Sequence, residues 1–309
     1  MRKALLDILT QLMHADRSIY ILTADTGFHV FDEFPQRFPN RFINVGISEA
    51  AMIGMAAGLA MAGKQVFTYG IVPFVTMRCF EQIRVDLCYP NLPVKVIGVG
   101  GGLTYGPAGM THHSIEDIAL MSCLPNMSVV CPGDPVETGL AIEASMVLKG
   151  PCYLRLGKSG EPAVHPRRPE GFAIGKGIAL RRGRDVALVA TGNMLATAAA
   201  ACDLLERRGL SCELISMHTV KPIDADLIAE AASRCPVIAT LEEHSIIGGL
   251  GSMVAGVAAD RGLKVALRRF ALPDRYEHKA GSQEYLRGQY GLTAEAVAAD
   301  LLKIAAAAD

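Results

Sequence analysis

Short apolar segments alternate with helical patterns along almost the whole chain, and this alternation constrains the fold more than any other feature. The strands predicted in the first half are Ser18–Thr23, Gln65–Tyr69, Val94–Val99, Ser128–Val130 and Tyr153–Leu156. The helices predicted between them are Ala4–Met13, Glu49–Ala62, Val75–Leu87, Ser114–Met121, with Ser114 as N-cap, and a helix around Val136–Leu148. The pattern predicts an α/β fold, in which helices cover both faces of a mainly parallel sheet.

A segment rich in Pro, Gly and charge, Gly157–Gly177, interrupts the pattern and is the predicted linker. Beyond it the alternation restarts, which predicts a second, smaller α/β domain. We therefore expect domains at residues 1–165 and 175–309. The elements predicted in the second are Val186–Ala190, Ala196–Arg208, Cys212–Ser216, Ala225–Ser233, Val237–Leu241, Leu250–Asp260 and Val265–Phe270.

Composition excludes several classes of protein. Half of the 309 residues are hydrophobic and a fifth are charged, which is typical of a chain with a real core. The net charge of −1 argues against a nucleic-acid surface. The eight cysteines show no metal-binding spacing, and no leader-like or membrane-spanning run is apparent. We expect a soluble cytoplasmic protein with reduced cysteines, without a metal site of its own.

Glu49 is the one charge between Val45 and Gly63, at the head of an apolar helix. A carboxylate in such a setting must be paired, or its pKa rises until it exists as a neutral acid. A carboxyl group that gives and takes a proton in a dry site is a candidate acid–base catalyst. The alternative is an exposed first-turn Glu that favours the helix dipole.

A set of motifs in the order of a known family surrounds this residue. They are Asn44-Val45-Gly46-Ile47-Ser48-Glu49-Ala50, Glu81-Gln82-Ile83-Arg84, Tyr89-Pro90-Asn91-Leu92-Pro93-Val94, Gly109-Met110-Thr111-His112-His113-Ser114-Ile115-Glu116-Asp117 and Leu124-Pro125-Asn126-Met127. The run from Phe31 to Pro135 resembles the pyrimidine-binding domain of the transketolase family of thiamine-diphosphate enzymes. The run Glu242–Ser252 resembles the family's C-terminal domain.

The family's diphosphate-binding motif, Gly-Asp-Gly followed by an Asn, is not found. The one Gly-Asp, at Gly133-Asp134, precedes a proline and follows the pyrimidine-domain motifs. The resemblance therefore implies the small subunit of a split transketolase, which transfers a two-carbon ketol unit. It further implies a separate large subunit that ligates Mg²⁺ and the diphosphate, and a heterotetramer about a two-fold axis.

The resemblance also assigns roles in the cofactor site. It implies that Glu49 hydrogen-bonds N1′ of the aminopyrimidine and favours the tautomer whose 4′-nitrogen removes the C2 proton. Phe74 stands where the family has a stacking Phe, Ile71 replaces a common aromatic residue, and Tyr69 lies nearby. His112 matches the histidine that acts on a substrate oxygen. For Phe74 the alternative is an ordinary core aromatic.

Further residues are expected to bind a sugar or sugar-phosphate substrate. His29 follows a strand's carboxyl end, and Arg155 stands where the family has a phosphate-binding arginine, with Arg2 as a second match. For His113 a structural role is an equal alternative. Two substrate contacts of the family are lost, since Ala108 replaces an Asp and Gly100 replaces a His. We therefore expect a rebuilt substrate site.

Two other functions stay open. The β subunit of a 2-oxo-acid dehydrogenase has the same two-domain plan, although the Thr111-His112-His113 loop fits transketolases better. A non-catalytic scaffold is the other alternative, and Glu49 argues against it, since an unpaired acid there would only cost stability.

Overall fold

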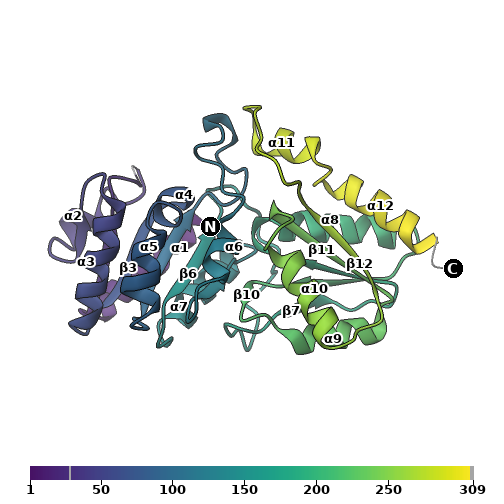
Figure 1. Cartoon of the computed structure of the whole chain (residues 1–309), viewed down its shortest axis with the longest axis horizontal. Coiled ribbons are helices and arrows are strands. Elements are labelled where there is room, and N and C mark those ends of the chain that lie inside the picture. The colour runs from purple at the N-terminus through teal and green to yellow at the C-terminus, as the bar shows by residue number, and fades with distance from the viewer. Residues whose placement is uncertain (28, 307–309) are drawn as a thin grey trace.

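The computed structural model describes residues 1–27 and 29–306 and confirms the α/β fold, with two sheets side by side (Figure 1). The first half contains α1 (Arg2–Ala15), β1 (Ile19–Thr23), α2 (Phe34–Arg37), β2 (Phe42–Asn44), α3 (Glu49–Met61), β3 (Gln65–Ile71), α4 (Val72–Val75), α5 (Phe80–Gln82), the π-helix η1 (Ile83–Cys88), β4 (Val94–Val99), the 3-10 helix η2 (Gly106–Ala108), α6 (Asp117–Ser122), β5 (Ser128–Val130), α7 (Pro135–Ser145) and β6 (Cys152–Leu156). The second half contains β7 (Ile178–Arg181), β8 (Val186–Ala190), the 3-10 helix η3 (Gly192–Met194), α8 (Leu195–Glu206), β9 (Cys212–Ser216), β10 (Thr219–Lys221), α9 (Ala225–Arg234), β11 (Val237–Ser245), α10 (Leu250–Asp260), β12 (Ala266–Leu272), α11 (Gln283–Gln289) and α12 (Ala294–Ala306).

The first sheet has seven strands in the order β10-β5-β6-β4-β3-β1-β2. Its strands are parallel except for β10, which runs antiparallel to β5. Apolar side chains fill both faces: one layer includes Met52 and Ile83, and the other includes Leu5 and Phe31. Burial on both faces explains why these strands read as continuous apolar runs.

The second sheet has the order β12-β11-β8-β9-β7, with β7 antiparallel to β9 and the other pairs parallel. The sequence did not predict the short strand β10. This strand belongs to the second half of the chain but pairs with β5 at the edge of the first sheet. It also did not predict β2, β7, α2, α11 and α12. Short edge strands carry little periodic signal, so they are easily missed.

The helix predicted over Val75–Leu87 is wrong as one continuous element. The chain instead forms α4, a turn at residues 76–79, α5 and the π-helix η1. In the turn, the Thr76 hydroxyl donates to the carbonyl of Val72 at 2.7 Å and the Cys79 thiol donates to the carbonyl of Phe74. Side chains that bond to the backbone in this way compete with the regular helical pattern.

The predicted N-cap at Ser114 is also wrong. Ser114 pairs with Gly102 in an isolated antiparallel bridge, through N–H···O bonds of 2.9 and 2.7 Å. Its backbone is therefore used to close the loop after β4, and α6 begins three residues later, at Asp117.

The linker predicted at Gly157–Gly177 contains neither helix nor strand, as expected. It is nevertheless fastened to the first domain. The Asp134 carboxylate accepts from the backbone N–H groups of Val164 and His165, at 2.8 and 2.9 Å. The His165 ring meets the buried Glu137 carboxylate at 2.7 Å.

Buried polar groups join the two domains. The Arg155 guanidinium donates to the carbonyl of Glu243 at 3.0 Å, and the Glu243 carboxylate accepts from the backbone N–H of Leu103 at 2.6 Å. Gln283 and Arg287, on α11, donate to the same carboxylate. These bonds hold the loop after β4 against the second domain.

Across the described residues, we find no helix that combines the length and the hydrophobicity needed to cross a bilayer.

Candidate functional site

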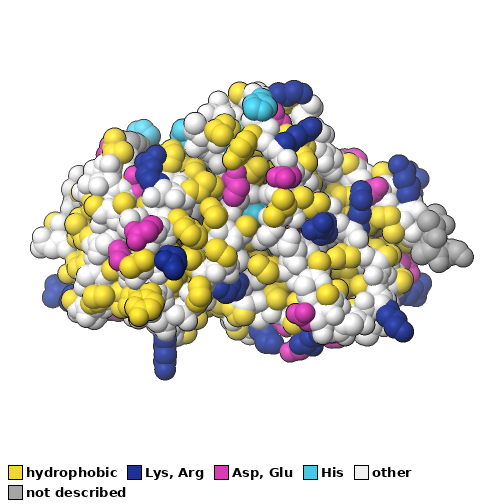
Figure 2. Space-filling model, in the orientation of Figure 1, with side chains coloured by type: hydrophobic (Ala, Val, Ile, Leu, Met, Phe, Trp, Pro, Cys, Tyr) yellow, Lys and Arg dark blue, Asp and Glu magenta, His cyan; other side chains and the backbone are white. Residues whose placement is uncertain are grey.

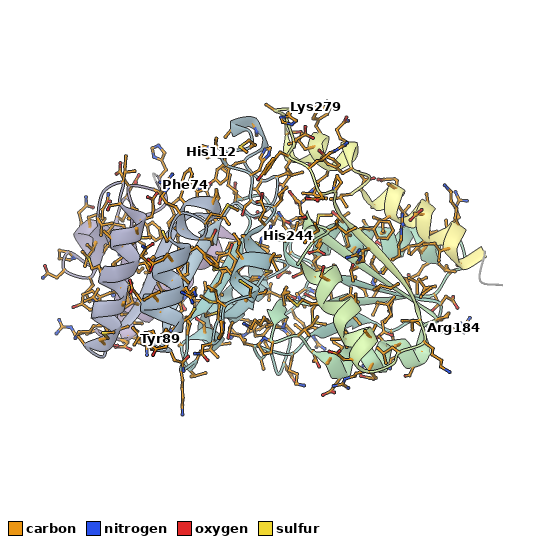
Figure 3. The ribbon with its side chains drawn as sticks, viewed as in Figure 1. Phe74, Tyr89, His112, Arg184, His244 and Lys279 are labelled. Carbon is orange, nitrogen blue, oxygen red and sulfur yellow. The ribbon has the colours of Figure 1, made fainter. Side chains whose placement is uncertain are left out.

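Three predicted site residues lie just beyond the carboxyl ends of three strands in the parallel part of the first sheet. Glu49 begins α3 after β2, Phe74 lies in α4 directly after β3, and His112 lies in the loop after β4. This edge of a parallel sheet is where α/β proteins bind ligands. Figure 3 shows Phe74 and His112 at the same edge of the first domain.

The Glu49 side chain is 3% exposed, so its carboxylate needs a partner. Arg78 provides it: Nη1 donates to both carboxylate oxygens, at 2.9 and 2.8 Å. The Arg78 side chain is itself 48% exposed. Burial, and then the Glu49 carboxylate, raises the pKa of the adjacent Cys79 thiol to about 12, which keeps that sulfur protonated and unreactive.

Phe74 and His112 stand together beside this pair. Their ring centroids are 5.3 Å apart with the planes at 71°, and the Arg78 guanidinium lies 4.5 Å from the Phe74 ring centroid. The Thr111 hydroxyl lies 3.0 Å from Nδ1 of His112, which orients the ring. The group therefore combines a buried carboxylate, an aromatic ring and an imidazole.

Tyr105 also lies beside His112. Its ring lies 6.1 Å from that of His112, and the Lys158 ammonium lies 4.9 Å from its centroid. Arg2 reaches the same region, donating from Nε to the carbonyl of Lys158 at 2.8 Å. Burial raises the pKa of the Tyr105 phenol, so it stays a neutral donor at physiological pH.

Gly100 makes room for Tyr105. A Cβ on Gly100 would overlap the Tyr105 ring, and the backbone there has φ of +90°, a conformation that favours glycine. We expect Gly100→Ala to destabilise the fold by about 1–3 kcal/mol and to displace Tyr105 from the site. Thermal unfolding of Gly100→Ala, with and without Tyr105→Ala, measures the two effects. Removal of the ring should restore only the part of the loss that comes from the overlap, and full recovery would show that backbone strain is negligible.

Of the other two predicted cofactor contacts, Tyr69 has a different environment and Ile71 lies near Phe74. Tyr69 is 3% exposed and packs edge-on against Phe31, with 4.8 Å between ring centroids. Its ring belongs to the core and presents little surface to a ligand. Ile71 is the last residue of β3 and is half-buried next to α4, so it lies near Phe74.

The other two histidines predicted in the site, His29 and His113, do not lie beside His112. The His29 side chain is 95% exposed and lies 3.4 Å from the Asp32 carboxylate. His113 is buried and lines a small cavity with Leu103, Glu116 and Tyr290, between the loop and the second domain. The structure therefore separates the adjacent histidines: His112 faces Phe74, whereas His113 faces the domain boundary.

Arg155 is buried and already paired. Its Nε donates to Asp117 at 2.7 Å, and its Nη2 donates to the carbonyls of Ser114 and Glu243. Its side chain is 3% exposed. In this arrangement the guanidinium joins the domains and is not presented to a substrate phosphate.

Sequence reasoning did not identify Arg78, Tyr105 or Lys158 as site residues. A signal for Arg78 was present, since it stands four residues after Phe74, the spacing of neighbours on a helix face. Tyr105 and Lys158 follow the ends of two different strands, β4 and β6. Their meeting is set by the pairing of those strands, which no local pattern reveals.

Among the residues that the structure describes, no group of three or more His, Cys, Asp or Glu is arranged to hold a metal ion.

Comparisons with known proteins identify the family. Residues 1–162 match the family model of the transketolase pyrimidine binding domain, and residues 175–297 match that of the transketolase C-terminal domain. A putative transketolase C-terminal section from Methanocaldococcus jannaschii is 37% identical over 98% of this chain and 95% of its own length. A subunit of the apulose-4-phosphate transketolase from Phocaeicola vulgatus is 34% identical over 96% of this chain and 94% of its own.

A solved structure leads to the same family. It is described as a split gene transketolase, inactive beta4 tetramer, and is 37% identical, with a TM-score of 0.88 over 98% of this chain and 96% of that chain. Transketolase structures from Pichia stipitis are 22% identical and share the fold, with a TM-score of 0.80. The chain belongs to the transketolase family.

Proposed function

We propose that this chain is the small subunit of a split transketolase, which transfers a two-carbon ketol unit between sugars or sugar phosphates. The observation that carries this proposal is the grouping of a buried Glu49, Phe74 and His112 at one sheet edge of a transketolase-family chain. The relatives that match nearly end to end are named as transketolase sections or subunits. None of these names favours a 2-oxo-acid dehydrogenase.

The site fits the aminopyrimidine of thiamine diphosphate. The Arg78 guanidinium, a planar cation, lies over Phe74 and donates to Glu49, so these two side chains are arranged to hold a flat group with in-plane donors. When bound, thiamine diphosphate supplies a nucleophilic C2 carbon. We assign Glu49 to hold a proton at N1′ of the pyrimidine and Phe74 to support the ring, with Ile71 beside it. Tyr69 supports the strand from the core.

His112 is assigned to move a proton at the hydroxyl or carbonyl oxygen of the substrate. Thr111 orients its ring through Nδ1, which directs Nε2 to the substrate. A second group of side chains, beside His112, suits an anionic sugar phosphate because it contains two cations. It consists of Tyr105, Lys158 and Arg2. We assign His29 to contact the substrate from the solvent side, since its exposed ring follows β1.

We expect His112→Asn to lower kcat by about 10²-fold, because proton transfer by a positioned side chain contributes on this order. The affinity for thiamine diphosphate should change little, since the cofactor's contacts are assigned to Glu49 and Phe74. Steady-state kinetics and a cofactor titration on the assembled enzyme measure both quantities. An equal loss of cofactor affinity and kcat would contradict the separation of roles.

We assign the diphosphate and its Mg²⁺ to a large partner subunit. The two domains of this chain are assigned to about residues 1–165 and 175–309. An exposed apolar surface supports such assembly. Met55, Met61, Val85 and Tyr89 are 43%, 67%, 41% and 88% exposed, beside Gly54 and Gly58. Figure 2 shows hydrophobic side chains gathered on the lower part of the first domain, which contains these residues. Exposed apolar surfaces often mark protein interfaces. We propose that this one contributes to a heterotetramer with a two-fold axis.

The proposal is tested by mixing the chain with the diphosphate-binding subunit of a split transketolase, thiamine diphosphate and Mg²⁺. Transfer from a ketose-phosphate donor to an aldose-phosphate acceptor is then followed by mass spectrometry. Transfer that needs both chains supports the proposal. Assembly with bound cofactor and no transfer across a panel of such sugars would favour the scaffold alternative.

A further inference from the structure

Arg78 is a prominent feature of the site that the proposed roles leave unexplained. Its Nη1 donates to Oε1 and Oε2 of Glu49 at 2.9 and 2.8 Å. Its guanidinium carbon lies 4.5 Å from the centroid of the Phe74 ring. The guanidinium therefore uses the same acid and the same aromatic face that the proposed function gives to the aminopyrimidine.

The two groups have similar recognition chemistry. A guanidinium is planar, is delocalised, stacks on aromatic rings and donates hydrogen bonds within its plane to a carboxylate. A protonated aminopyrimidine has the same features: a flat ring, delocalised charge and in-plane N–H donors. The Glu49 side chain is only 3% exposed and both of its carboxylate oxygens accept from Arg78, so we expect it to hold one such partner at a time.

We propose that Arg78 is a positioning residue that occupies the pyrimidine site of the cofactor-free chain and leaves it when thiamine diphosphate binds. This inference rests on the proposed function, because it assumes that Glu49 and Phe74 bind the cofactor. Exchange of one cationic partner for another keeps the Glu49 carboxylate paired at every stage. An unpaired buried carboxylate would be costly, and the arginine removes that cost from the cofactor-free state.

The local backbone suits such a movement. Arg78 lies in the turn between α4 and α5, outside regular helix, and its backbone N–H donates to the carbonyl of Pro73. Its side chain is 48% exposed, so solvent is available to the guanidinium once it leaves Glu49. Phe74 lies within α4, so we expect its ring to stay in place when the arginine moves.

The test is a double-mutant cycle on cofactor affinity in the assembled enzyme. The variants are Arg78→Ala, Arg78→Lys, Glu49→Gln and the double variant Arg78→Ala/Glu49→Gln, with thiamine diphosphate and Mg²⁺ titrated by calorimetry. Arg184→Ala is the matched control, because Arg184 is 84% exposed at the far end of the second domain (Figure 3). Circular dichroism verifies that each variant is folded.

We expect Arg78→Ala to lower the Kd for thiamine diphosphate by up to about tenfold, which corresponds to 1.4 kcal/mol of lost competition. Arg78→Lys, which keeps a cation without the planar fork, should give a smaller decrease. In the Glu49→Gln background the effect of Arg78→Ala should shrink, since the ion pair is already broken. The control should leave the Kd unchanged.

An unchanged or higher Kd in Arg78→Ala would overturn the proposal, as would an equal effect in both Glu49 backgrounds. These results differ from a failure of the proposed function. If the wild-type assembly does not bind thiamine diphosphate at all, the cofactor assignment itself is wrong. If it binds and the cycle shows no coupling, the cofactor assignment stands and the role of Arg78 is wrong.

Discussion

Glu49→Gln is expected to lower the turnover of the assembled enzyme by about 10²–10⁴-fold, the contribution of a positioned proton-transfer group. Glutamine has nearly the same shape as glutamate and still fills the site, but it cannot hold the proton assigned to Glu49 at N1′. The Glu49 side chain is only 3% exposed, so water is a poor substitute for its carboxylate. The alanine variant should be at least as inactive.

Two measurements separate this loss from a loss of structure. Exchange of the cofactor's C2 proton for deuterium reports the assigned step directly, and sedimentation reports assembly. Glu295→Gln, an exposed position in the first turn of α12, is the control and should keep full activity. Unchanged turnover in Glu49→Gln would contradict the catalytic role and leave the scaffold alternative.

Arg155→Ala is expected to reduce the free energy of unfolding by about 3–5 kcal/mol, the range for removing one partner of a buried ion pair. The substitution leaves Asp117 without its cation in a fully buried site, and it removes two bonds to carbonyls. Urea unfolding measures the loss. The exposed pair of Arg261 and Asp226 is the control, and Arg261→Ala should cost at most about 1 kcal/mol.

The effect should depend on pH. Burial opposes ionisation of Asp117, but the adjacent Arg155 guanidinium holds the pKa of that carboxyl below its usual value. A lowered pKa contributes stability above the unfolded-state value, and this is lost as the pH falls through the folded-state value. The destabilisation by Arg155→Ala should therefore be largest near neutral pH and shrink in acid. A loss that is independent of pH would show that packing, not charge, dominates.

The sequence predicted the parts of the molecule that depend on local patterns. The main strands of both sheets are continuous apolar runs, and the helix that begins at Glu49 has one charge at its head, so both were recognisable. Strand β10 was not, because its pairing with β5 depends on a contact between halves of the chain. The turn at residues 76–79 was missed because Thr76 and Cys79 read as helix-compatible until their backbone bonds are known.

The grouping of three candidate site residues was also predictable. Glu49, Phe74 and His112 follow different strands of one parallel sheet, and such residues meet at its carboxyl edge. Burial was harder to anticipate: Arg155 and Tyr69 were predicted to contact substrate and cofactor, yet one pairs with Asp117 and the other packs in the core. Arg78 was not predicted because its importance depends on its pairing with Glu49, which lies 29 residues away in the sequence.

The proposed cofactor site is shared between this chain and a large subunit, and every assigned role depends on that sharing. The most direct test is calorimetric titration of thiamine diphosphate with Mg²⁺ into this chain alone, and then into its mixture with the large subunit. We predict saturable binding in the mixture and none to the chain alone. Tight binding to the chain alone would contradict a shared site, and binding to neither would contradict the cofactor assignment.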